Sequence, residues 1–202
     1  GNSALTGEIN GDLKLAGWDE TLVGQLSLST AATRFTVDDS AKKRRQVILD
    51  NTDLDIRLER QQLELTGNTE FTDTGNARIQ LHWPLTEADR AIDGTLHLEL
   101  DKLDWLNPFV TSVDELQGRA NAFIRFAGTA DRPVLSGQLQ LNGLSAYVPQ
   151  LGIHLANGDL QLKHRDRTSW QLDGTVDSGE GSLAMNGLFE VRRPDDWRGE
   201  LF

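Results

Sequence analysis

The sequence predicts an all-β protein, because short runs of alternating apolar and polar residues follow one another along nearly all of its 202 residues. A period of two places successive side chains on opposite faces of a strand. In 11–17, for example, Leu13 and Leu15 share one face while Asp12 and Lys14 share the other. The pattern predicts roughly eleven to thirteen strands of about five to seven residues. The clearest runs are 11–17, 24–29, 53–59, 77–83, 94–100, 122–128, 137–143, 158–164, 170–176 and 181–187.

Helical patterns are nearly absent from the chain. The longest candidate is 103–118, where Asn107-Pro108 interrupts the pattern and reduces the expectation to one or two helical turns. A further short turn is expected at 86–91. With no helix to cover a sheet, the apolar face must meet another sheet or a molecule that is not part of this chain.

A repeated phrase supports a repeat architecture. Residues 7–17 align without gaps on 118–128, and the strand–bend–strand unit returns roughly every 20–25 residues. Each repeat begins with a glycine. Such a glycine indicates a backbone position with a positive φ or a β-bulge, or it is an ordinary residue of a hairpin turn. The phrase Gly-x-Leu-x-Leu begins at Gly11, Gly24, Gly94, Gly137 and Gly158.

Composition and charge limit the possible partners. The formal net charge of -11 argues against nucleic acid, since phosphate binding needs a basic surface. The basic run Lys42–Arg45 is interpreted as a solvated hairpin loop. The absence of cysteine excludes disulfides and thiolate metal sites. No apolar run is long enough to span a bilayer as a helix.

The sequence also lacks recognisable catalytic motifs. The four histidines have no metal-ligand spacing on one strand face, and His97 is expected to face outward. Asp53 and Asp55 alternate with leucines, so they are interpreted as solvating carboxylates rather than catalytic ones. We therefore expect no catalytic residue, no metal and no cofactor.

The apolar face is unusually rich in leucine, with 31 leucines against 9 valines and 7 isoleucines. Close-packed β cores favour stiff β-branched and aromatic side chains. Two interpretations remain open: an ordinary core of unusual composition, or a groove that receives something fluid. The tryptophans are candidates for closing the ends or seams of such a groove; they are Trp18, Trp83, Trp105, Trp170 and Trp197.

Residues 94–162 resemble the repeat of the AsmA-like/TamB family. The matching features are Trp105-Leu106-Asn107-Pro108, then Leu116-Gln117-Gly118, and then the bend from Gly128-Thr129 to Pro133, followed by Leu135 and Gly137. The first copy departs from this pattern, since Trp18-Asp19-Glu20-Thr21 stands where the bend should be.

This resemblance implies a single domain over 1–202, a fragment from the C-terminal half of a longer protein. The implied fold is all-β: one long, curled, mostly antiparallel sheet forming an open, taco-like apolar trough with minimal helix. The implied protein is an envelope protein anchored in the inner membrane, of which this fragment is a soluble periplasmic portion.

The implied partners are the outer-membrane barrel protein TamA and hydrophobic cargo, either phospholipid acyl chains or unfolded outer-membrane protein clients such as autotransporters. The implied role is non-catalytic: phospholipid transport between the membranes, outer-membrane protein assembly, or both. The alternative is a closed β-sandwich that serves as a scaffold or spacer. The residues expected to line the groove are Leu13, Leu15, Leu26, Leu28, Leu54, Ile56, Leu58, Ile79, Leu81, Leu96, Leu98, Leu100, Ile124, Phe126, Leu139, Leu141, Leu160 and Leu162.

Overall fold

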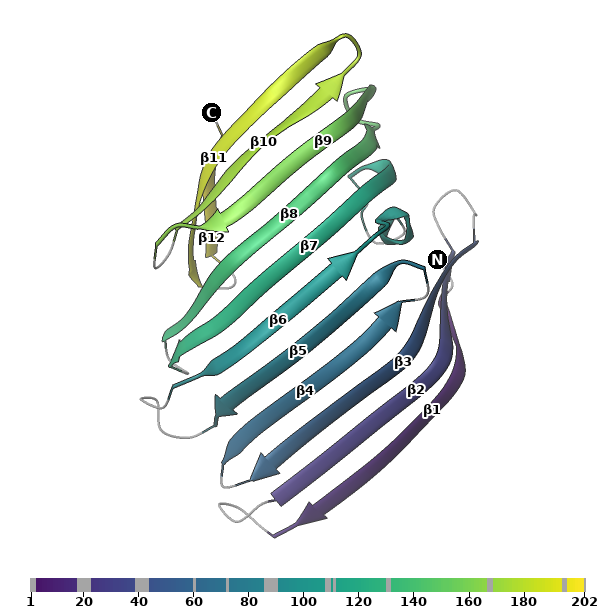
Figure 1. Ribbon diagram of the computed structural model, residues 1–202, viewed down its shortest axis with the longest axis vertical. Coiled ribbons are helices and arrows are strands. Elements are labelled where there is room, and N and C mark those ends of the chain that lie inside the picture. The colour runs from purple at the N-terminus through teal and green to yellow at the C-terminus, as the bar shows by residue number, and fades with distance from the viewer. Residues whose placement is uncertain are drawn as a thin grey trace.

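One antiparallel sheet makes up almost the whole structure, which is a computed structural model. Each strand pairs with its neighbours in the sequence, in the order β1 to β12 (Figure 1). The structure describes residues 3–17, 23–38, 44–59, 61–71, 73–85, 91–107, 110, 112–129, 132–166, 169–193 and 196–201.

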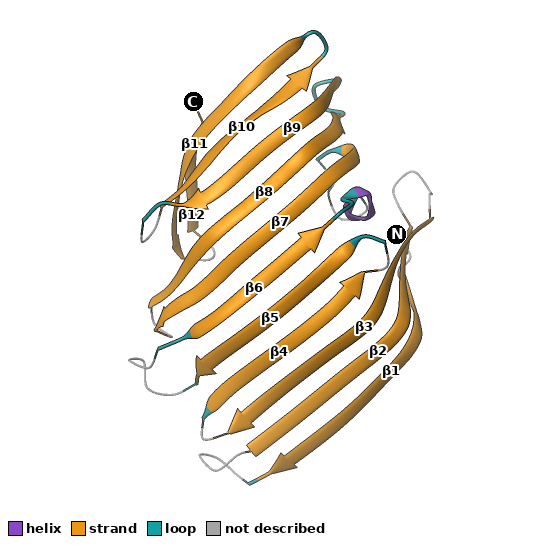
Figure 2. Cartoon of the chain, viewed as in Figure 1, coloured by secondary structure: helices purple, strands orange, loops and turns teal. Residues whose placement is uncertain are grey.

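The strands account for nearly all the described residues, and one short 3-10 turn, η2 (Asp104–Leu106), is the helix drawn in Figure 2. The strands are β1 (Ser3–Ala16), β2 (Val23–Asp38), β3 (Arg44–Glu59), β4 (Gln62–Phe71), β5 (Gly75–Pro84), β6 (Asp93–Leu100), β7 (Asp114–Thr129), β8 (Arg132–Val148), β9 (Ile153–His164), β10 (Ser169–Ser178), β11 (Gly181–Arg193) and β12 (Asp196–Leu201).

The expected fold class is confirmed: the protein is all-β, the pairings are antiparallel, and β1 and β12 are the unpaired edges of an open sheet. The alternative of a closed β-sandwich is wrong, because the described strands belong to one sheet rather than two packed ones.

The number of strands agrees with the prediction, but the predicted strand lengths are wrong. The strands run from 6 residues in β12 to 17 in β8. Glycines that resemble turn residues lie inside them, such as Gly11 in β1 and Gly137 in β8. Gly11 pairs with Leu28 and Gly137 pairs with Ile124, and the register is unbroken on both sides of each glycine.

The helical expectation over 103–118 is correct only for its first half. The single turn η2 lies there, whereas residues from Asp114 onward belong to β7. The segment 86–91 lies outside the described residues except for Ala91, which forms an isolated bridge with Thr129.

The aligned segments 7–17 and 118–128 have corresponding structures in β1 and β7. Each strand shifts register near its first aligned residue, between Thr6 and Glu8 and between Gln117 and Arg119. Each segment also ends at a glycine with positive φ, 83° at Gly17 and 86° at Gly128. The repeat seen in the sequence is therefore also present in the structure.

The sheet leaves an unusually large part of the chain in contact with solvent. Its accessible surface is 13333 Å², whereas a compact monomer of 22.4 kDa exposes about 9,400 Å². The excess of about 3,900 Å² arises because the described strands form a single sheet and not two packed layers. The sheet is also not flat, because its outer strands β1–β3 and β11–β12 curl away from the plane of the central strands (Figure 1).

Candidate functional site

The candidate site is one face of the sheet, which we call the apolar face. Residues directly opposite each other on paired strands project to the same side, so a row can be followed from strand to strand. One such row consists of Leu13, Leu26, Ile56, Leu65, Leu81, Gly94, Phe126 and Leu135.

Parallel rows extend this face across β1 to β11. The row beside the first contains Leu28, Leu54, Gly67, Ile79, Leu96, Ile124 and Gly137. Two further rows lie toward the other end of the strands. They contain Ala77, Leu98, Ala122, Leu139, Leu162 and Leu172, and Gly75, Leu100, Ala120, Leu141, Leu160, Gly174 and Met185.

The structure thus places all the sequence-predicted groove residues on the same face. Leu15 and Leu58 join it through Gly24, which lies between them. Sequence reasoning missed Leu63 and Leu65 on β4, although they follow the same alternation. It also missed the aromatic contact that Phe71 makes, for which no local signal exists.

Exposure varies strongly across the apolar face. At the first strand, Leu13 and Leu15 are 64% and 65% exposed, and Leu183 on β11 is 56% exposed. In the centre the leucines are half-buried by their neighbours, and Leu100 is only 5% exposed. Within the described part of the chain, no second layer lies over most of this hydrophobic surface.

Glycines on the apolar face make room for the leucines beside them. A Cβ at Gly174 would lie 2.5 Å from Leu160 Cδ2, and a Cβ at Gly94 would lie 2.9 Å from Leu81 Cδ1. A positive φ is found at Gly137, at 138°, but not at Gly11, Gly24, Gly94 or Gly158. At Gly11, Gly24 and Gly94 the expectation of a positive φ or a bulge is wrong, because these glycines leave space for neighbouring side chains. Gly158 does lie at an irregularity, since its partner Leu144 stands between two register shifts.

The short η2 turn covers part of the apolar face near the end of β6. Leu103 is 3% exposed and forms a buried cluster with Leu100 and Ala120, against which Leu98, Leu139, Leu141 and Leu144 pack. The Trp105 and Phe71 rings stack with centroids 5.7 Å apart. Because η2 contacts both β7 and β3, the sheet curves around it and the apolar face is concave there.

The opposite, polar face is held by cross-strand hydrogen bonds. Ser27 Oγ donates to Asp55 Oδ2 at 2.7 Å, and Gln25 Nε2 donates to the same oxygen at 3.2 Å. Arg57 Nε lies 2.8 Å from Asp55 Oδ1. The bond from Ser27, then that from Gln25, and the Arg57 charge hold the pKa of Asp55 below its usual 3.8.

The histidines do not form a metal site among the described residues, where no cluster of three or more potential ligands occurs. As predicted, His97 faces outward on the polar face, where its ring centroid lies 4.6 Å from that of Phe123. His164 lies opposite Trp170 on β10, with ring centroids 5.4 Å apart.

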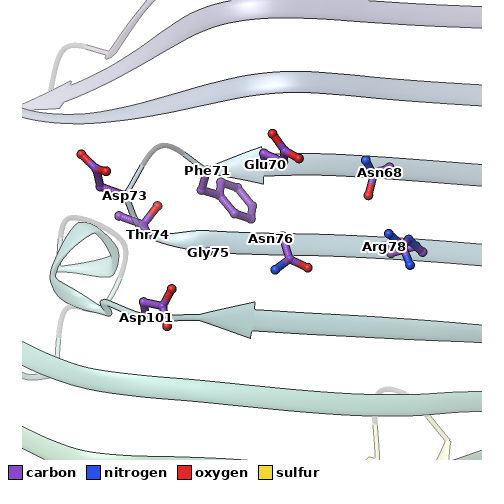
Figure 3. A pocket seen from close by; sticks show the side chains of 9 residues that line it. All are labelled: Asn68, Glu70, Phe71, Asp73, Thr74, Gly75, Asn76, Arg78 and Asp101. Atoms are coloured by element: carbon purple, nitrogen blue, oxygen red, sulfur yellow. The ribbon is translucent and has the colours of Figure 1, made fainter.

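A shallow recess of about 500 Å³ lies beside the β4–β5 turn. Figure 3 shows its side chains, among them Asn68 and Glu70 from β4, Arg78 from β5 and Asp101 after β6. Most of its lining is polar, so it is not a continuation of the apolar face. Among the described residues, no helix has the length and apolarity needed to cross a membrane.

These features define a class of proteins built on an open, curled β-sheet with one face apolar across its breadth. The chain belongs to the TamB family, since the family model described as "TamB, N-terminal domain" matches residues 1–141. The family recognised from residues 94–162 is thereby confirmed, but the matching model is that of the N-terminal domain rather than of the C-terminal half.

A curated relative agrees with this assignment. The chain is 24% identical over 113 residues to the translocation and assembly module subunit TamB of Haemophilus influenzae, a match that covers 56% of this chain. The match spans only 9% of that relative's length. No solved structure matches the chain significantly.

Proposed function

We propose that the apolar face binds the hydrocarbon chains of phospholipids and guides them across the periplasm between the inner and outer membranes. The segment is then a non-catalytic, periplasmic part of an inner-membrane-anchored protein, and the leucine rows are its binding surface. The observation that carries this proposal is the continuous, uncovered apolar face, together with the large excess of exposed surface.

Hydrocarbon suits this face better than an unfolded polypeptide does. The rows traced above consist of leucine, isoleucine, phenylalanine, methionine, alanine and glycine, and they contain no charged side chain. Peptide groups buried against such a surface lack hydrogen-bond partners, which costs about 1–3 kcal/mol for each group. A lipid chain has no such groups and gains about 0.8 kcal/mol per buried methylene.

The partner that we propose is the outer-membrane protein TamA. It rests on family membership and on the relative's name as a subunit of a translocation and assembly module. Co-purification of the full-length protein with and without β1–β12 would test whether this segment contributes to that contact.

Site-specific photocrosslinking in cells tests the lipid proposal. A small diazirine side chain replaces Ile79, which lies on the apolar face, or the adjacent Gln80, which lies on the polar face. After illumination, mass spectrometry should find phospholipid adducts at position 79 and only background at position 80. Equal labelling at the two positions, or adducts of protein alone at position 79, would contradict the proposal.

A second candidate function is supported by the edge of the sheet. β1 (Ser3–Ala16) pairs only with β2, so its other side offers unpaired backbone groups to an incoming strand of a client protein. Replacing Lys14 with proline on this edge should reduce client crosslinking if strand addition occurs. Unchanged crosslinking would argue against it.

A further inference from the structure

The η2 segment, Leu103 to Asn107, is the element of the described structure that covers the apolar face from above. Its position within the apolar face raises the question of what it does to anything bound there. Leu103 forms a buried cluster with Leu100 and Ala120 of the sheet, and Leu98, Leu139 and Leu141 pack against that cluster.

The segment is anchored at both ends. Before it, the Asp101 backbone N–H donates to Thr74 O at 2.7 Å, which ties it to the β4–β5 turn. After it, the Asn107 amide makes two bonds to the Leu116 backbone on β7: Nδ2 donates to Leu116 O at 3.1 Å, and Oδ1 accepts from Leu116 N at 2.7 Å. Asn107 Nδ2 also donates to Asp104 O at 2.7 Å.

Apolar contacts hold the segment down between these anchors. Leu103 is almost fully buried, and Trp105 stacks on Phe71 at an interplanar angle of 23°. The contacts with β7 and with β3 place η2 between two parts of the curled sheet that are not neighbours in strand order. It therefore occupies one side of the concavity rather than lying outside it.

On the remaining side of the apolar face, none of the described elements forms a cover. The row of Gly67, Ile79, Leu96, Ile124 and Gly137 lies closer to the opposite ends of the strands, and none of these residues belongs to the cluster under η2. A hydrocarbon chain passing from β3 toward β8 has this row available, whereas Leu100 is buried in the cluster with Leu103 and is only 5% exposed.

We propose that Leu103 and Trp105 set the width of the groove and confine acyl chains to the row that contains Ile79, Leu96 and Ile124. This inference rests on the proposed function, because it names which part of the same face the lipid uses. Both are specificity-determining residues: they restrict where a chain lies and how many chains can lie side by side.

The test compares two probe positions in the full-length protein in cells. A diazirine side chain close in size to leucine is placed at Leu96 on the open row or at Leu100, which is buried with Leu103. In the parent protein we expect phospholipid adducts at position 96 and only background at position 100. With Trp105→Ala, or with Leu103→Ala, adducts at position 100 should rise to a level comparable with position 96.

Two variants separate confinement from simple structural support. Asn107→Ala releases the anchor to Leu116 without removing an apolar side chain, and it should also raise labelling at position 100. Asp104→Ala changes an exposed side chain on the same turn and should leave both positions as in the parent. Continued labelling at position 96 in each variant reports that the sheet remains folded.

The failures of the two proposals can be distinguished. Absence of phospholipid adducts at both positions in the parent would overturn the lipid function itself. Equal labelling at positions 96 and 100 in the parent would overturn only the confinement by η2. Unchanged background at position 100 in Trp105→Ala, Leu103→Ala and Asn107→Ala, with position 96 still labelled, would overturn it as well.

Discussion

Leu54 on β3 lies directly opposite Gly67 on β4, and the leucine occupies the space that a side chain on Gly67 would need. A Cβ at position 67 would lie 3.2 Å from Leu54 Cδ1 and 2.9 Å from Ile79 Cγ2 on the other neighbouring strand. The glycine therefore allows large side chains from both flanking strands to meet above it on a concave surface.

We expect Gly67→Ala to destabilise the sheet by about 1–2 kcal/mol, since overpacking outweighs the gain from a less flexible unfolded chain. Gly181→Ala is the matched control. Its nearest neighbour is Ser178 O at 3.6 Å and its φ is not positive, so this change should be neutral or slightly stabilising. Urea unfolding followed by tryptophan fluorescence measures both. A Gly67→Ala variant as stable as Gly181→Ala would contradict this account.

Arginine substitutions should reveal how open the apolar face is. Leu13 is 64% exposed, so the guanidinium of Leu13→Arg stays in water and should cost within about 1 kcal/mol. Leu100 is 5% exposed, and the unpaired charge of Leu100→Arg should cost several kcal/mol. Thermal melts by circular dichroism compare the two. Similar and severe losses in both would mean that the face is sealed at β1 as it is at β6.

Acid should weaken the polar face through Asp55. Because its pKa is lower in the folded protein than its usual 3.8, the unfolded chain binds the proton more tightly. The stability contributed by ionised Asp55 is present above the unfolded pKa and is lost as the pH falls through the lower, folded pKa.

The variant Asp55→Asn removes this pH-dependent contribution. We expect its urea midpoint to fall less between pH 7 and pH 3 than that of the parent protein. Asp53→Asn, on the same strand and the same face, is the control and should fall as much as the parent. If the urea midpoint falls equally in the parent and in Asp55→Asn, ionised Asp55 does not contribute to the pH dependence of stability.

The exposed leucines should also bind a neutral, environment-sensitive dye such as Nile red, because Leu13, Leu15 and Leu183 are each more than half exposed on the apolar face. Replacing both Leu13 and Leu15 with serine should reduce the fluorescence gain. Lys14→Ser, which changes the residue between them on the polar face, should not. If the parent protein does not increase the fluorescence of Nile red, the apolar face is covered in solution.

The facing of side chains could be predicted from the sequence because strand geometry converts a period of two directly into two faces. The face to which Leu96 and Leu98 project could be predicted without any knowledge of tertiary contacts. Strand lengths could not be predicted in this way. Gly118, at a φ of 132° and a register shift, resembles a turn residue in the sequence, yet β7 continues through it.

The solvent exposure of the leucines at the candidate site could not be predicted from local sequence patterns. Leu13 and Leu100 occupy equivalent places in the alternation, but one is exposed and the other is buried. Leu100 lies in a buried cluster with Leu103 of the η2 segment, whereas Leu13 lies on the edge strand β1. No periodicity within a single strand carries information about such a contact.

Because strands that follow one another in the sequence are also neighbours in the sheet, the loss of one strand affects mainly the strands beside it. Apart from the contact between η2 and β3, the main contacts of each strand are with the strands just before and just after it. Stability in such an array is approximately a sum of nearest-neighbour terms. Losing or gaining a whole hairpin leaves every other pairing intact, so evolution can adjust the reach of the protein one hairpin at a time.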